Sequence, residues 1–203
     1  MPSWSAGVAA FTHTYCENAN GAPSDEAQVA MKPSFSSSNA VWLCALAILT
    51  VAALAQAGWY SARLPERVAT HFEADGVADG WGSRMSLVLG QAGISLAVFL
   101  LFAGIGLLLP RLPDAFINLP HKDHWLAPER RAQSLQRVRG MLLRIGCATA
   151  AFLLVLFQLI YAANRAPEPR LSPLSWLALA LFLAYVAVEI VAMLLLFSRR
   201  FRR

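Results

Sequence analysis

Apolar residues gather in four long blocks that are separated by polar stretches. The blocks are Val41–Tyr60, Leu87–Leu109, Met141–Ala163 and Leu174–Phe197. Each runs for about 20 residues, which is the length that an α-helix needs to cross a hydrocarbon core of roughly 30 Å. None of them alternates apolar and polar positions as a barrel strand does, and backbone in lipid must satisfy its hydrogen bonds internally. The pattern therefore predicts an all-α integral membrane protein with four transmembrane helices.

The polar stretches between these blocks predict the loops. Residues 61–86 are expected to form a polar outer loop, residues 110–140 a basic inner loop and residues 164–173 a short outer loop. Residues 1–40 are rich in Ser, Ala, Asn and Gly and lack an apolar period, which is typical of a disordered tail. The transmembrane domain is therefore expected to span residues 41–203.

Met31 is an alternative start of the chain. It precedes Lys32-Pro33 and the first apolar block, and the segment that it begins resembles a secretory signal peptide. The block continues into Trp59-Tyr60, an aromatic pair suited to a membrane interface, and this favours a retained helix over a cleaved one.

Composition argues against a soluble enzyme. Only 14% of the 203 residues are charged, compared with about 25% in soluble domains. The chain has no G-x-S-x-G, no H-E-x-x-H, no phosphate-binding loop and no dinucleotide fingerprint. We therefore expect neither catalysis nor a cofactor.

The net charge of +5 does not predict a nucleic-acid partner, because the basic residues lie near the ends of the apolar blocks. Basic residues concentrate in the inner loop and in the C-terminal SRRFRR, whereas the first loop holds three arginines. By the positive-inside rule the inner loop and both termini are cytoplasmic, and the first loop lies outside a bacterial inner membrane. The expected partner is the lipid bilayer.

The end of the inner loop predicts a basic amphipathic helix. Residues 128–143 read PERRAQSLQRVRGMLL, and Pro128 suits the first turn of a helix. Helical spacing puts arginines on one face and an apolar stripe on the other, formed by Ala132, Leu135, Val138 and Leu142. We expect this helix to lie at the inner leaflet, where anionic headgroups add about 1 kcal/mol per basic residue.

Residues 70–82, THFEADGVADGWG, resemble a calcium loop only in part. Such a loop needs an acidic ligand at its first position and a glutamate at its twelfth, where this chain has His71 and Gly82. Tight turns account better for Gly76 and for Asp79-Gly80, and Trp81 suits an interfacial anchor. No metal site is predicted.

Two further polar positions follow from the same loop. Ser83 or Ser86 is expected to cap the second transmembrane helix. His71 has no role in the turn chemistry, and a histidine on an outer face can form a structural hydrogen bond or sense pH.

Glu189 is an acidic residue inside the fourth apolar block. A carboxylate there is costly and marks a candidate functional position. Arg144 lies about one turn inside the third block from the same membrane face, so we expect the two side chains to pair. A structural pair and an ion or proton pathway both remain open.

The segment LPERVATHFEADGVADGWGSR, residues 64–84, resembles the signature of a bacterial membrane protein family of unknown function, which we expect to extend over residues 59–85. That signature also occurs at the N-terminal end of the SdpI-like immunity proteins, which protect cells against a sporulation-delaying toxin. Ala69 departs from it, because the family usually has proline there. The resemblance implies a recognition loop whose candidate residues are Thr70, His71, Phe72, Gly76, Asp79, Gly80 and Trp81.

The inner-loop sequence NLPHKDHWLAPERR, residues 118–131, resembles a second run that is found in some members of that family. Its candidate residues are Asn118, Pro120, Trp125, Pro128, Arg130 and Arg131.

These observations favour a protein that recognises a protein or peptide ligand through its outer loop, in a sensing, immunity-like or envelope-stress role. The main alternative is a small transporter or channel component that uses Glu189 and Arg144. An enzyme that uses His71 and the loop carboxylates ranks third. A homo-oligomer is compatible with each hypothesis.

Overall fold

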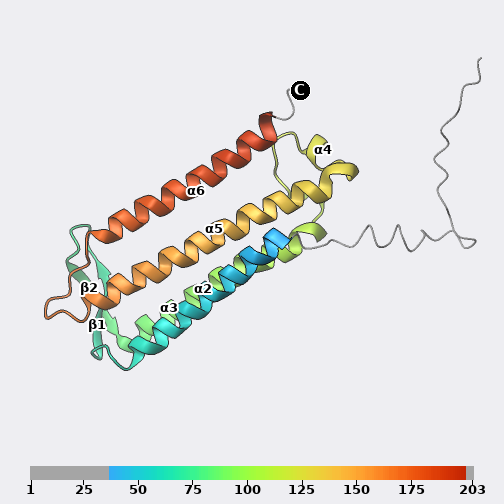
Figure 1. Cartoon of the computed structure of the whole chain (residues 1–203). Helices are drawn as coiled ribbons and strands as arrows, with labels where there is room; N and C mark the ends of the chain where they lie inside the picture. Colours follow the sequence, from blue (N-terminus) through green and yellow to red (C-terminus); the bar gives the residue numbers. More distant parts are fainter. Residues whose placement is uncertain (1–36, 200–203) are drawn as a thin grey trace, which may run out of the picture. The chain divides into compact units, whose positions relative to one another are not determined.

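The computed structural model describes residues 37–199, and four of the helices in this part of the chain are long and apolar enough to cross a membrane (Figure 1). The fold class predicted from the apolar blocks is confirmed. The elements, in chain order, are α2 (Ser37–Ser61), β1 (Arg67–Phe72), β2 (Ala78–Ser83), α3 (Arg84–Leu108), η1 (Leu109–Arg111), η2 (Asp114–Phe116), α4 (Lys122–Trp125), α5 (Pro128–Ala163) and α6 (Leu174–Arg199).

The first helix begins earlier than its apolar block. Ser37 opens α2, whereas the sequence predicted that the helix would start at Val41. Residues 37–40, which were predicted to belong to the tail, are therefore part of the helix. Residues 1–36, which include Met31, lie outside the described residues.

Three helices, α2, α3 and α5, pack against one another, and α6 packs chiefly against α5 (Figure 1). A network of polar side chains joins the three-helix core, as expected of amides between apolar helices. Gln91 is fully buried; it donates to Gln56 over 2.6 Å, and Gln56 donates to Gln158 over 2.9 Å. Gln158 donates to the hydroxyl of Tyr60, and the hydroxyl of Tyr161 donates to Gln91.

The predicted amphipathic segment is the first part of α5, which is one continuous helix with Pro128 in its first turn, as predicted. Leu135 and Val138 are buried, but Ala132 is exposed. The assignment of all the arginines to an outward face is wrong. Arg139 is 5% exposed, and its Nε donates to the carbonyl of Gly106 on α3 over 2.5 Å.

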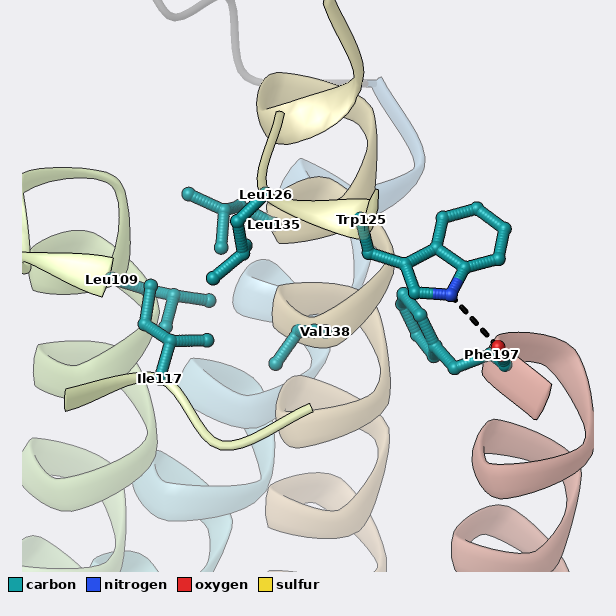
Figure 2. Packing of buried hydrophobic residues seen from close by; sticks show 7 residues of the cluster. All are labelled: Leu109, Ile117, Trp125, Leu126, Leu135, Val138 and Phe197. Atoms are coloured by element: carbon teal, nitrogen blue, oxygen red, sulfur yellow. Dashed lines mark hydrogen bonds between the residues drawn. The ribbon is translucent and has the colours of Figure 1, made fainter. Parts of the chain in front are cut away.

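We call one end of the fold the basic end. It consists of η1, η2, α4, the first turns of α5 and the last turn of α6, and it contains a small apolar core. The core residues converge from these elements, and the indole N–H of Trp125 donates to the carbonyl of Phe197 over 2.8 Å (Figure 2). They are Leu109, Ile117, Trp125, Leu126, Leu135, Val138 and Phe197.

Candidate functional site

The predicted recognition loop is an antiparallel hairpin of β1 and β2, which the sequence pattern did not indicate. We call the hairpin and the loop of residues 164–173 together the hairpin end of the fold. The side chains of Leu64 and Val68 are buried there with Tyr60, Leu87 and Tyr161, which belong to the three core helices. An isolated two-stranded hairpin is only marginally stable in water, so this packing stabilises it.

Asn164, at the C-terminal end of α5, holds the outer edge of β1. Its Oδ1 accepts from the backbone N–H of Ala69 over 2.6 Å, and its Nδ2 donates to the carbonyl of the same residue over 2.9 Å. Both residues are buried, and the amide therefore substitutes for a neighbouring strand. Sequence reasoning missed Asn164, because an asparagine after a helix is most simply read as a cap.

The tip of the hairpin is docked on the loop between α5 and α6. Gly76 has φ of +87°, as the turn prediction required, and a Cβ there would lie 2.5 Å from the carbonyl oxygen of Leu171. Val77 pairs with Arg170 as an isolated β-bridge, and the indole N–H of Trp176 donates to the carbonyl of Ala74 over 3.1 Å. The two loops thus form one fixed unit.

His71 pairs across the hairpin with Asp79. The distance between Nδ1 and Oδ1 is 2.6 Å, and the side chains are 73% and 37% exposed. The strand register shifts on both sides of His71, so that Thr70 and Asp79 are the extra residues of two bulges, and bulges re-aim side chains. Gly80 leaves the space for this pair, because a Cβ there would lie 2.6 Å from the His71 Cβ.

Trp81 lies on the outward face of β2 and is 45% exposed. The guanidinium of Arg67 lies over its ring, 5.2 Å from the centroid. The glycine after it, Gly82, is close to the Thr70 side chain, and Ser83 caps α3 by accepting from the N–H of Ser86, as predicted. The outward face of the hairpin therefore combines an aromatic ring, a cation and a histidine–carboxylate pair.

Phe72 has a different environment from the rest of the motif. It is half-buried and lines a hollow of about 500 Å³ between the hairpin tip, the end of α5 and the start of α6. The other apolar residues of that hollow are Ala74, Phe152, Leu156, Leu171, Pro173, Trp176 and Leu179. The hollow lies directly beside the docked tip.

The inner-loop motif is structural at two of its positions. Trp125 binds the end of α6 through its hydrogen bond to the carbonyl of Phe197. Arg131 donates to Asp114 over 2.9 Å and to the carbonyls of Pro110 and Leu112. These contacts fold residues 110–127 against the start of α5. Asn118, Pro128 and Arg130 are exposed, and Pro120 is half-buried.

Glu189 and Arg144 pair as the sequence predicted. Nε and Nη2 of Arg144 donate to the two carboxylate oxygens of Glu189, each over 2.7 Å. Tyr185, one turn earlier on α6, donates its hydroxyl proton to the same carboxylate over 2.9 Å, a partner that the sequence analysis did not identify. The pair lies far from the hairpin end. The hairpin residues and the Arg144–Glu189 pair are therefore two separate candidate sites.

Neither region holds a cluster of metal ligands. Among residues 37–199 no three His, Cys, Asp or Glu side chains are grouped as a metal ion would require. His71 and Asp79 alone provide too few ligands for a dedicated site.

Comparison with known proteins gives one match. Residues 45–94 match a family described as a domain of unknown function (DUF1648). The matched range runs from α2 through the whole hairpin into α3 and so contains all seven candidate recognition residues. No curated protein and no solved structure matches the chain.

Proposed function

We propose that this multi-pass membrane protein recognises a protein or peptide ligand through the outward face of its hairpin. The observation that carries the proposal is that the hairpin is fixed from three sides while its polar face stays exposed. Asn164 holds β1, Leu171 and Trp176 hold the tip, and Ser83 joins β2 to α3. Rigidly held loops commonly carry binding function.

The exposed chemistry suits a protein surface. Trp and Arg are enriched among residues that dominate protein–protein binding energies, and the hairpin presents Trp81 with Arg67 over its ring. His71 and Asp79 add a directional polar pair beside them. The hollow next to Phe72 is lined mainly by apolar side chains and offers space for an apolar group of the ligand.

The role that we propose is sensing, immunity against a toxin or a response to envelope stress, at the outer face of a bacterial inner membrane. The resemblance to the SdpI-like proteins supports the immunity-like form of this role. The concentration of basic residues at the opposite end of the helices supports an outward hairpin.

The test uses Trp81→Ala and His71→Ala in a strain that depends on the protein for growth under toxin or envelope stress. We expect both variants to lose the protective phenotype while keeping wild-type abundance, because their side chains are exposed. Glu168→Ala, an exposed change in the neighbouring loop, is the matched control and should behave as wild type. Wild-type protection by both hairpin variants would refute the proposal.

A second candidate function is transport of a small solute or ion past Glu189 and Arg144. It is favoured by a hollow of about 580 Å³ that reaches this pair from the basic end. It ranks second because the Phe152 and Phe182 rings stack at 4.9 Å and pack α5 against α6 beyond the pair. Liposome flux that is the same with wild type and Glu189→Gln, or absent from both, would exclude transport through this pair.

A further inference from the structure

The hollow at the basic end lies between the start of α2, the first half of α5 and the second half of α6. Its volume is about 580 Å³, within the range of roughly 300–1,000 Å³ that is typical of small-molecule sites. This hollow is separate from the hairpin and from the residues of the proposed recognition surface.

The hollow is a built feature of the α5–α6 pair. The Arg144–Glu189 ion pair ties α6 to α5 at its deep end, and the Trp125–Phe197 hydrogen bond ties the last turn of α6 to α4, just before α5, at the basic end. Two small residues that line it, Gly140 on α5 and Ala192 on α6, leave the space between these ties.

Its lining is divided by polarity. The start of α2 and most of the α5 side provide amides, a hydroxyl and guanidinium groups, and the α6 side is apolar apart from Glu189. The polar residues are Ser38, Asn39, Gln133, Gln136, Arg137, Arg144 and Glu189, and the larger apolar residues are Met141, Met193 and Leu196. A ligand that satisfies both sides has a polar head and an apolar tail.

The charge of the hollow is positive. Glu189 neutralises Arg144 through the bidentate pair, and this leaves Arg137. Within the described residues no hydrogen bond or ion pair engages the Arg137 guanidinium, which is half-buried at the wall of the hollow. A planar guanidinium matches the geometry of a phosphate group and binds it through two parallel hydrogen bonds.

The depth of the hollow in a membrane fits a lipid headgroup. Helix α5 has 36 residues and is therefore about 54 Å long, well beyond a hydrocarbon core of roughly 30 Å. Its apolar block starts at Met141, so that Arg137 and Gln133 lie at the level of the headgroups and Met141 and Arg144 lie deeper. Because α6 packs chiefly against α5, the hollow is not sealed by α6 on the α2 side.

We infer that this hollow binds one anionic phospholipid. Its phosphodiester accepts hydrogen bonds from Arg137 and from the amide of Gln133, and its acyl chain lies along Met141, Met193 and Leu196. Basic pockets between transmembrane helices are known sites for anionic headgroups. A free phosphate ester would use the polar wall alone and would leave the apolar wall uncovered.

The test measures binding of phosphatidylglycerol to the delipidated full-length protein by native mass spectrometry, with phosphatidylcholine as the neutral reference. Wild type should prefer phosphatidylglycerol, and Arg137→Gln should weaken that binding about tenfold, the loss expected for one charge-assisted pair of hydrogen bonds. Arg130→Gln is the matched control, because it removes the same charge from an exposed position outside the hollow. It should bind within about twofold of wild type, as expected for a surface charge.

A second variant keeps the charge and removes the space. Ala192→Phe should fill the hollow and weaken binding to a similar extent, with cooperative unfolding retained as the check on its fold. Equal losses in Arg137→Gln and Arg130→Gln would show diffuse surface attraction and overturn the inference. So would wild-type binding by Ala192→Phe. Glycerol 3-phosphate that competes at the same concentration as the lipid would assign the hollow to a free phosphate ester instead.

Discussion

At the scale of single residues, the hairpin depends on a few side chains that take the place of a larger sheet. Asn164 satisfies both backbone groups of Ala69, which have no strand partner on that edge. The bond requires an N–H at position 69, and a proline there would lack it. Ala69, where the resembled family usually has proline, and Asn164 therefore form one structural unit in this chain.

Asn164→Ala should destabilise the hairpin end, because the N–H and carbonyl of Ala69 would then be buried without partners. We expect a loss of about 2–3 kcal/mol in the free energy of unfolding, measured in detergent. Hydrogen exchange at residues 67–72 should rise as well. Asn118→Ala, an exposed change at the opposite end, should alter neither quantity. An Asn164 variant as stable as this control would contradict the role of the amide.

Gly76→Ala should be destabilising for two reasons. Its φ of +87° strains any L side chain, and the new Cβ would meet the Leu171 carbonyl oxygen at 2.5 Å. We expect a cost of about 1–3 kcal/mol, again in thermal unfolding. Gly90→Ala is the control, since nothing lies within 4 Å of its Cβ position in α3 and alanine favours helix. If Gly76→Ala and Gly90→Ala had the same stability, the described packing of the hairpin tip against Leu171 would be contradicted.

At the scale of elements, the sequence was most informative about the helices and least about the hairpin. Each apolar block is long enough to cross a membrane, so the hydrophobic pattern alone determines the four spans. β2 reads ADGWGS, and its Asp and Gly residues are depleted in strands. The strand forms because β1 is held by Asn164 and the tip by Leu171, contacts between residues that are distant in sequence.

The inner segment shows the same limit. Its helical period predicted the buried Leu135 and Val138, but the period also placed Arg139 on an outward face. The neighbouring helix α3 offers a carbonyl at Gly106, and a charge-assisted bond to it compensates the burial of the guanidinium. A single-sequence pattern contains no information about such a partner.

The Arg144–Glu189 pair should behave as a unit that joins α5 and α6. Arg144→Gln or Glu189→Gln alone leaves one charge in an apolar span, and we expect each to cost about 3 kcal/mol of stability. The double variant should cost much less than the sum, because it leaves no charge unpaired. Thermal unfolding of the four proteins in detergent gives the coupling energy. Additive losses would mean that the pair is not coupled.

At the scale of the whole described chain, the two ends of the helix bundle have different chemistry. The hairpin end presents Trp81 and the His71–Asp79 pair, and the basic end contains Arg131, Arg139 and the positive hollow. This difference is the observation on which the proposed topology rests, with the hairpin outside and the basic end inside.

The orientation can be tested with single cysteines in a cysteine-free background. A cysteine at exposed position Glu168 should react with a membrane-impermeant maleimide in intact spheroplasts. One at Asp123, exposed at the basic end, should react only after permeabilisation. The reverse pattern would invert the proposed topology and place the hairpin in the cytoplasm.

The central claim is that the outward face of the hairpin contacts another protein. It is tested most directly by a photoactivatable amino acid at position 81 in living cells, with the same group at position 168 as the control. We predict a discrete protein adduct from position 81 and no such adduct from position 168. Lipid adducts alone from position 81, or the same protein adducts from both positions, would contradict the account.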